Sequence, residues 1–78
     1  MIDHRQSRAA RSLLGWTQQQ LADTAGVALA TIQFFESDKR VPIPNNLTAI
    51  RRALEDAGVE FIAARSGKGV GVRLREDR

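Results

Sequence analysis

The sequence has no cysteine and only one histidine, His4. Without cysteine the chain forms no disulfide, offers no thiolate to a metal ion and performs no thiol redox chemistry. A single histidine makes no metal-ligand cluster, so we expect no metal site and no cofactor. No apolar run approaches the roughly 18 residues of a membrane span, and the N-terminus has no signal-peptide core. These absences predict a protein that works in the cytoplasm and not in a membrane.

Convincing enzymatic motifs are also missing. The segment SGKGVG, residues 66–71, contains glycines like those of a phosphate-binding loop, but it leads into the strand-like VGVRLR instead of a helix. Asp3, His4 and Ser7 are too close together, and too near a terminus, to suggest a hydrolytic triad. We therefore predict no catalytic residue and expect that the protein is not an enzyme.

The chain is short and mildly basic, with 78 residues and a net charge of +3. A chain of this length makes one small domain and buries only ~60–65% of its unfolded surface, so its stability is expected to be modest unless it dimerises. Residues 16–37 carry only two charges, Asp23 and Glu36. Basic residues flank this stretch on both sides, where phosphates would lie if the stretch sat in a groove of nucleic acid.

The most informative stretch is TQQQLADTAGVALATIQFFE, residues 17–36. Thr17 and Gln20 have the T-x-x-Q spacing of a capping box, which predicts the start of a helix. Gly26 stands where a residue without a Cβ ends a helix with least strain. The next helix is predicted over about residues 29–37. Two short helices joined by a glycine-containing turn form a helix-turn-helix unit.

This unit resembles the Cro/phage-repressor type of helix-turn-helix, the XRE family of transcriptional regulators. The likeness is carried by T-Q-x-x-L-A, then G-V, then T-I-x-x-x-E, together with Gly15 and Lys39. The motif residues are Thr17, Gln18, Leu21, Ala22, Gly26, Val27, Thr31, Ile32 and Glu36. The likeness implies a mainly α fold, a four-helix domain over residues 1–58. It also implies sequence-specific binding of double-stranded DNA, with the second helix of the motif in the major groove.

The resemblance places five residues at the base-facing surface: Ala28, Leu29, Ala30, Gln33 and Phe34. Only Gln33 can read a base by two hydrogen bonds, most naturally adenine, whereas Leu29 and Ala30 are suited to thymine methyl groups. An exposed Phe34 has three interpretations: a methyl contact, a protein-protein contact, or core packing if the helix is rotated.

The residues expected to contact phosphate are Thr17, Gln18, Lys39, Arg40, Arg8 and Arg11. Gln18 lies at a helix N-terminus, where backbone amides favour an anion. Arg11 also matches a family position that pairs with the glutamate matched by Glu36. We therefore expect an ion pair that joins the first and third helices, the alternative being that both side chains are solvated.

Helices are also predicted on both sides of the motif. The first spans residues 4–14, with Asp3 as its N-cap and a glycine after its last turn. The fourth spans about residues 47–57, because apolar residues recur there at i, i+3 and i+7. Asn45 or Asn46 is expected to cap it.

The linker between the third and fourth helices spans residues 37–46. Two prolines force extended backbone on Val41 and Ile43. We expect these two apolar side chains to pack under the core.

Residues 59–78 are predicted to form a C-terminal β-hairpin and a short tail, because two runs with period-2 alternation flank a glycine-containing loop. The last residues, 76–78, are expected to be frayed. An isolated hairpin is marginal in water. We expect it to pair edge to edge, or to be swapped, in a homodimer; the alternative is a hairpin folded back on its own fourth helix.

The sequence thus predicts a small, dimeric, DNA-binding transcriptional regulator. Two other functions remain open. An antitoxin-type module would bind DNA and also hold a toxin through the hairpin or Phe34. A pure interaction module would have kept the fold, lost DNA binding and gained another protein partner.

Overall fold

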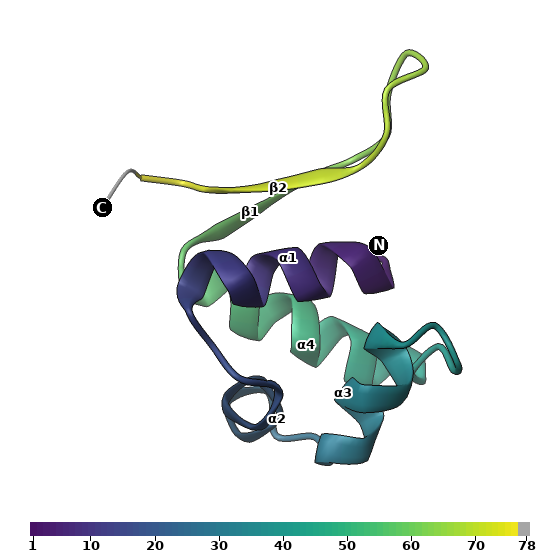
Figure 1. The fold of residues 1–78 in the computed structure, drawn as a ribbon, viewed down its shortest axis with the longest axis vertical. Coiled ribbons are helices and arrows are strands. Elements are labelled where there is room, and N and C mark those ends of the chain that lie inside the picture. Colours follow the sequence, from purple (N-terminus) through teal and green to yellow (C-terminus); the bar gives the residue numbers. More distant parts are fainter. Residues whose placement is uncertain (77–78) are drawn as a thin grey trace.

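The computed structural model describes residues 1–76, so residues 77 and 78 of the expected frayed tail lie outside the described residues. Its elements, in chain order, are α1 (His4–Leu14), α2 (Gln18–Ala25), α3 (Leu29–Glu36), α4 (Pro44–Asp56), β1 (Val59–Ile62) and β2 (Gly71–Leu74). The hairpin lies across one side of α1, and α2 and α3 lie on the other side (Figure 1). The predicted four-helix domain with a C-terminal hairpin is confirmed.

The helix starts follow from local hydrogen bonding. The Asp3 carboxylate accepts from the Gln6 amide at 2.9 Å, and the Gln6 side chain accepts from the Asp3 amide at 2.9 Å. Thr17 and Gln20 make the same reciprocal pair at 3.1 and 2.7 Å. The glycines that follow α1 and α2, Gly15 and Gly26, have positive φ angles of 69° and 71°. Both predicted caps are present, and they fix the limits of α1 and α2.

The start of α4 differs from the prediction. The helix begins at Pro44, with Ile43 as an N-cap that makes no side-chain hydrogen bond. Asn45 and Asn46 lie inside the first turn and cap nothing. The reason is that proline at the first helical position has a suitable φ and lacks an amide hydrogen that would need a partner.

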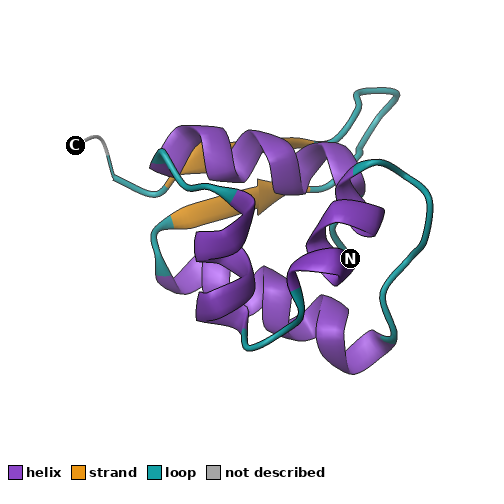
Figure 2. Cartoon of the chain, turned by 60° about the horizontal axis from the view of Figure 1, so that its bottom comes forward, coloured by secondary structure: helices purple, strands orange, loops and turns teal. Residues whose placement is uncertain are grey.

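The prediction that Val41 and Ile43 pack under the core is wrong. Their exposed fractions are 71% and 64%. The linker runs over the surface, where its extended backbone leads directly into α4 (Figure 2). The core is filled by the helices and the first strand, whose fully buried apolar side chains include Leu21, Ile32, Ile50, Leu54 and Val59.

The hairpin is a two-stranded antiparallel sheet. Val59 lies opposite Leu74, and Ile62 lies opposite Gly71. Beyond the strands the chain extends away from the body to a tight turn, where Arg65 and Lys68 exchange backbone hydrogen bonds of 3.0 and 2.9 Å (Figure 1). The apolar side chains of β1 and β2 pack against the helical core, so the sheet is supported from one face.

Gln6 anchors this hairpin to α1. Gln6 is only 4% exposed, and its side-chain nitrogen donates to the carbonyl oxygens of Ile62 at 3.2 Å and Gly71 at 3.0 Å. One amide group therefore contacts both strands. The hairpin is folded back on its own chain, on α1 as well as on α4, and this packing needs no second copy.

Replacing Gln6 by alanine should lower the free energy of unfolding by about 1–3 kcal/mol, because it removes a helix cap and the donor to two strand carbonyls. Urea unfolding followed by circular dichroism measures the change. The matched control is Gln20→Ala, since Gln20 holds the same capping-box position on α2 but is exposed. Equal losses for the two variants would show that the strand contacts add no stability.

Candidate nucleic-acid interface

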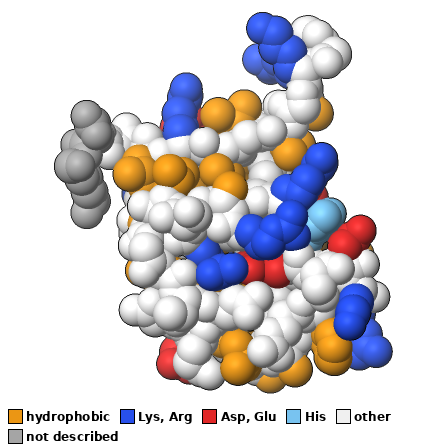
Figure 3. Space-filling view, viewed as in Figure 1, with side chains coloured by type: hydrophobic (Ala, Val, Ile, Leu, Met, Phe, Trp, Pro, Cys, Tyr) orange, Lys and Arg blue, Asp and Glu red, His pale blue; other side chains and the backbone are white. Residues whose placement is uncertain are grey.

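The motif consists of α2, a short turn and α3. Ile32 and Phe35 are buried on the inner face of α3, at 0% and 4% exposure. Ala30, Gln33 and Phe34 lie on the opposite, exposed face. Apolar side chains gather along the lower edge of the molecule in Figure 3, where Figure 1 shows the α2–α3 turn and α3. The outer face of α3 is therefore free to meet a partner.

The structure separates one of the five base-facing candidates from the others. Ala28, Ala30, Gln33 and Phe34 are exposed, whereas Leu29 is partly buried and packs against the core. Its side chain is therefore less available for a thymine methyl than the sequence suggested. Phe34 is 42% exposed, so the interpretation of Phe34 as a core residue is wrong. The packing of Ile32 and Phe35 sets the rotation of the helix that turns Phe34 outward.

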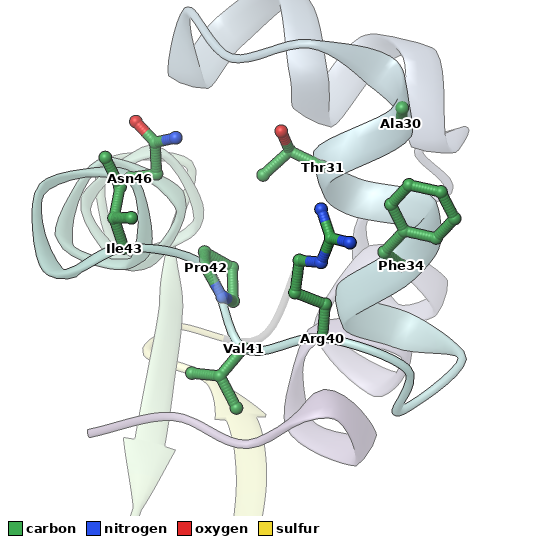
Figure 4. A pocket seen from close by; sticks show the side chains of 8 residues that line it. All are labelled: Ala30, Thr31, Phe34, Arg40, Val41, Pro42, Ile43 and Asn46. Atoms are coloured by element: carbon green, nitrogen blue, oxygen red, sulfur yellow. The ribbon is translucent and has the colours of Figure 1, made fainter.

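A shallow groove of about 290 Å³ adjoins this face. Figure 4 shows Ala30 and Phe34 of α3 on one side of it and the linker residues on the other. The guanidinium carbon of Arg40 lies 5.4 Å from the centre of the Phe34 ring, a cation–π contact. Arg40 and its neighbour Lys39 are both exposed. The structure thus places one cation, Arg40, beside the outer face of α3, with Lys39 next to it in the chain.

The last residue of α3, Glu36, is buried at 2% exposure and receives hydrogen bonds from two other helices. Arg11 of α1 holds it with Nη2 at 2.6 Å from Oε1 and Nε at 2.9 Å from Oε2. Ser7 of α1 donates to Oε2 at 2.6 Å, and Gln18 of α2 donates to Oε1 at 3.2 Å. The ion pair expected between Arg11 and Glu36 is present, and it forms part of a network that joins α1, α2 and α3.

This network controls the protonation of Glu36. Burial by itself raises the pKa of the carboxyl, but hydrogen bonds from Arg11, Ser7 and Gln18 outweigh burial and hold the pKa below its ordinary value of 4.5. A carboxyl with a lowered pKa in the folded state stabilises the fold above its unfolded pKa. This contribution is lost as the pH falls below about 4.5 and through the folded pKa.

The predicted phosphate ligands fall into two groups. Arg11 is directed inward: its guanidinium donates to Glu36 and, through Nη1, to the carbonyl oxygen of Trp16 at 3.0 Å. Its side chain is only 19% exposed, so this position does not favour a phosphate contact. Gln18 is half-buried and directs its amide to Glu36.

The other phosphate candidates remain at the surface. Arg8 is exposed overall, and one of its guanidinium nitrogens donates to the carbonyl oxygen of Glu36, at the C-terminus of α3. A cation there is also favoured by the helix dipole. Thr17 uses its hydroxyl to cap α2. The exposed cations nearest α3 in sequence are thus Lys39 and Arg40.

The chain matches the family model described as helix-turn-helix over residues 8–55, more than half of its length. It belongs to the XRE family of helix-turn-helix proteins. Among curated proteins, none matches it. The match spans the motif and most of α1 and α4, and it ends before the hairpin.

Membership of the XRE family makes the chain a helix-turn-helix protein of a DNA-binding regulatory type. This family is not typically enzymatic. Within residues 1–76, no helix is long and apolar enough to cross a membrane.

Sequence reasoning missed several contacts at this XRE-type site. The hydrogen bond from Ser7 to Glu36 was not predicted. The i, i+4 spacing of Ser7 and Arg11 is the signal that could have found it, because this spacing puts both side chains on one face of a helix. The stacking of Arg40 on Phe34 has no comparable sequence signal, since it depends on the path of the linker.

Arg11→Ala should lower the free energy of unfolding by about 3–5 kcal/mol, because it leaves the Glu36 carboxylate buried without its ion-pair partner. Arg51→Ala is the matched control, since Arg51 and Glu55 pair at 3.2 Å with both side chains 39% exposed. That exposed pair is worth less than about 1 kcal/mol. Chemical denaturation of both variants measures the two losses, and a small loss for Arg11→Ala would contradict a structural role for the network.

Proposed function

We propose that the protein is a sequence-specific transcriptional regulator that inserts α3 into the major groove of double-stranded DNA. The observation that carries this proposal is the outer face of α3. It is exposed and carries no charged side chain, in a chain whose family match includes the whole motif. Helix-turn-helix proteins use this face of the second motif helix to read base edges.

The proposed roles follow from the positions of the side chains. Gln33 is exposed on α3 and reads adenine through N6 and N7. Lys39, Arg40 and Arg8 neutralise phosphates, which fixes the register of the protein on the duplex. At the N-terminus of α2 the Thr17 amide already donates to the Gln20 side chain, so the backbone amide of Gln18 is the group there that favours a phosphate.

Fluorescence anisotropy against random-sequence DNA and against a duplex selected from a random pool tests this proposal. The selected duplex should bind more tightly, and the logarithm of its affinity should fall with the logarithm of salt concentration by ~0.9 for each phosphate neutralised. The two variants Gln33→Ala and Lys39→Ala separate reading from positioning. Gln33→Ala should weaken discrimination at one base pair by about 1–3 kcal/mol, and Lys39→Ala should weaken all sequences alike and lower the salt slope by ~1.

At moderate salt, the folded protein should bind the selected duplex more tightly than random-sequence DNA, and its affinity should fall as salt is added. If it binds neither duplex, the DNA-binding proposal fails. If Gln33→Ala leaves the preference among sequences unchanged, then Gln33 is not the reader.

We also propose that the regulator is a homodimer whose subunits meet through the hairpin. Within the described residues the sheet has two strands, so each strand has one edge without a strand partner. Ile62 is 38% exposed and lines a broad groove on the hairpin with Ala63 and Gly71. A dimer presents two reading helices to two half-sites, which a monomer does not.

Light scattering should give a mass of two chains at micromolar concentration, and Ile62→Asp should shift the mass toward one chain by placing a charge in the interface. Ile43→Asp is the control, because Ile43 is more exposed but lies in the linker. A mass of one chain for the unmodified protein would refute the dimer.

A further inference from the structure

The outer face of α3 is unusual in its chemistry. Of its exposed side chains, Gln33 alone has an amide for base-edge hydrogen bonds, and Ala30 and Phe34 on either side of it are apolar. The only charged residue within α3 is Glu36, which is buried at the inner end of the helix. A surface of this kind gains little from hydrogen bonding and more from apolar contact.

The groove beside Phe34 extends this apolar surface. Its lining includes Ala30 and Phe34 of α3 and, from the linker, Arg40, Val41, Pro42 and Ile43. Arg40 is the only charged residue among them, and none of them is acidic. The groove therefore suits an apolar group carried by a polyanion, because the guanidinium of Arg40, which lies over the Phe34 ring, would attract a phosphate backbone.

The major groove offers one apolar group of this kind, the C5-methyl of thymine. A cytosine methylated at C5 carries the same methyl group at the same ring position. Resting on the DNA-binding function proposed above, we propose that Phe34, together with Ala30, reads the C5-methyl group of a pyrimidine. The protein then distinguishes thymine from uracil, and 5-methylcytosine from cytosine, at a defined position of its site. Cytosine methylation within a site would therefore change its occupancy.

The size of the effect follows from the burial of one methyl group. A buried methylene contributes an amount that corresponds to roughly a fourfold change in dissociation constant. The exposed Phe34 ring provides the apolar surface for such a contact, and the small side chain of Ala30 lets the helix approach the base closely. We therefore expect one or two sensitive positions in the site and a change of about fourfold at each.

The experiment removes single methyl groups from DNA. A tight-binding duplex is first selected from a random pool, and each thymine in it is then replaced in turn by deoxyuridine, which keeps the base-pairing groups and lacks the methyl. Anisotropy should show roughly fourfold weaker binding at the sensitive positions. Where a cytosine is placed at a sensitive position, 5-methylcytosine should bind about fourfold more tightly than cytosine.

The protein variants assign the contact. Phe34→Ala should bind the thymine and deoxyuridine duplexes equally well at those positions, and it should remain folded because Phe34 is partly exposed. Val41→Ala is the matched control: Val41 is also exposed and apolar and lines the same groove, but it belongs to the linker. It should keep the full sensitivity to the methyl group.

Each other result overturns the inference in a recognisable way. A selected site that is bound with unchanged affinity after every thymine-to-deoxyuridine replacement would refute methyl reading and leave sequence-specific binding intact. If no duplex is preferred, both methyl reading and the proposed sequence-specific binding are refuted. Equal methyl sensitivity in Phe34→Ala would remove Phe34 from the contact. Conversion of a dimer to a monomer by Phe34→Ala, measured by light scattering, would show that a second copy covers the groove instead.

Discussion

The buried carboxylate of Glu36 is the constraint on which the arrangement of the motif depends. It ends α3, and its hydrogen-bond donors come from α1 and α2. A buried charge without partners is strongly destabilising, so a shift of α3 relative to either helix would be opposed. The network thus fixes three helices at one point with side chains that would otherwise favour water. Precise placement of α3 comes from this inner contact and needs nothing from its outer face.

Because α3 is held by its inner face, the residues on its outer face are not needed to position the helix. Because the ion pair and the apolar side chains of Ile32 and Phe35 hold α3 from inside, its exposed positions accept residues chosen for the partner alone. In the proposed complex with DNA, the attracting charges are supplied from outside the helix, by Lys39 and Arg40 in the linker and Arg8 on α1. The proposed function therefore assigns affinity for DNA and selectivity among sequences to different segments of the chain.

Much of the fold could be predicted because its signals are local. The capping boxes at Asp3 and Thr17 and the glycines that follow give the limits of α1 and α2 within a few residues of sequence. The start of α4 was missed because proline is common both in linkers and at the first position of a helix. The sequence alone does not distinguish these two positions for Pro44. The burial of Val41 and Ile43 was overestimated because hydrophobicity does not tell where a linker runs.

At the site, the ion pair of Glu36 with Arg11 could be predicted from the family resemblance, whereas the remaining contacts could not. Leu29 turns inward because the short turn after α2 brings the first residue of α3 against the core. The contact between Arg40 and Phe34 joins an element to a loop, and it has no periodic pattern in the sequence. Its position depends on packing across the whole domain.

The anchoring of the hairpin by Gln6 also has a consequence for the order of folding. The contacts of Gln6 join residues 56 and 65 positions apart, so α1 is synthesised first and receives these contacts last. Contacts of such long sequence separation slow folding because a long loop must close before they form. The helical motif is assembled from nearer contacts. During synthesis the buried side of α1 therefore stays incomplete until β2 has left the ribosome.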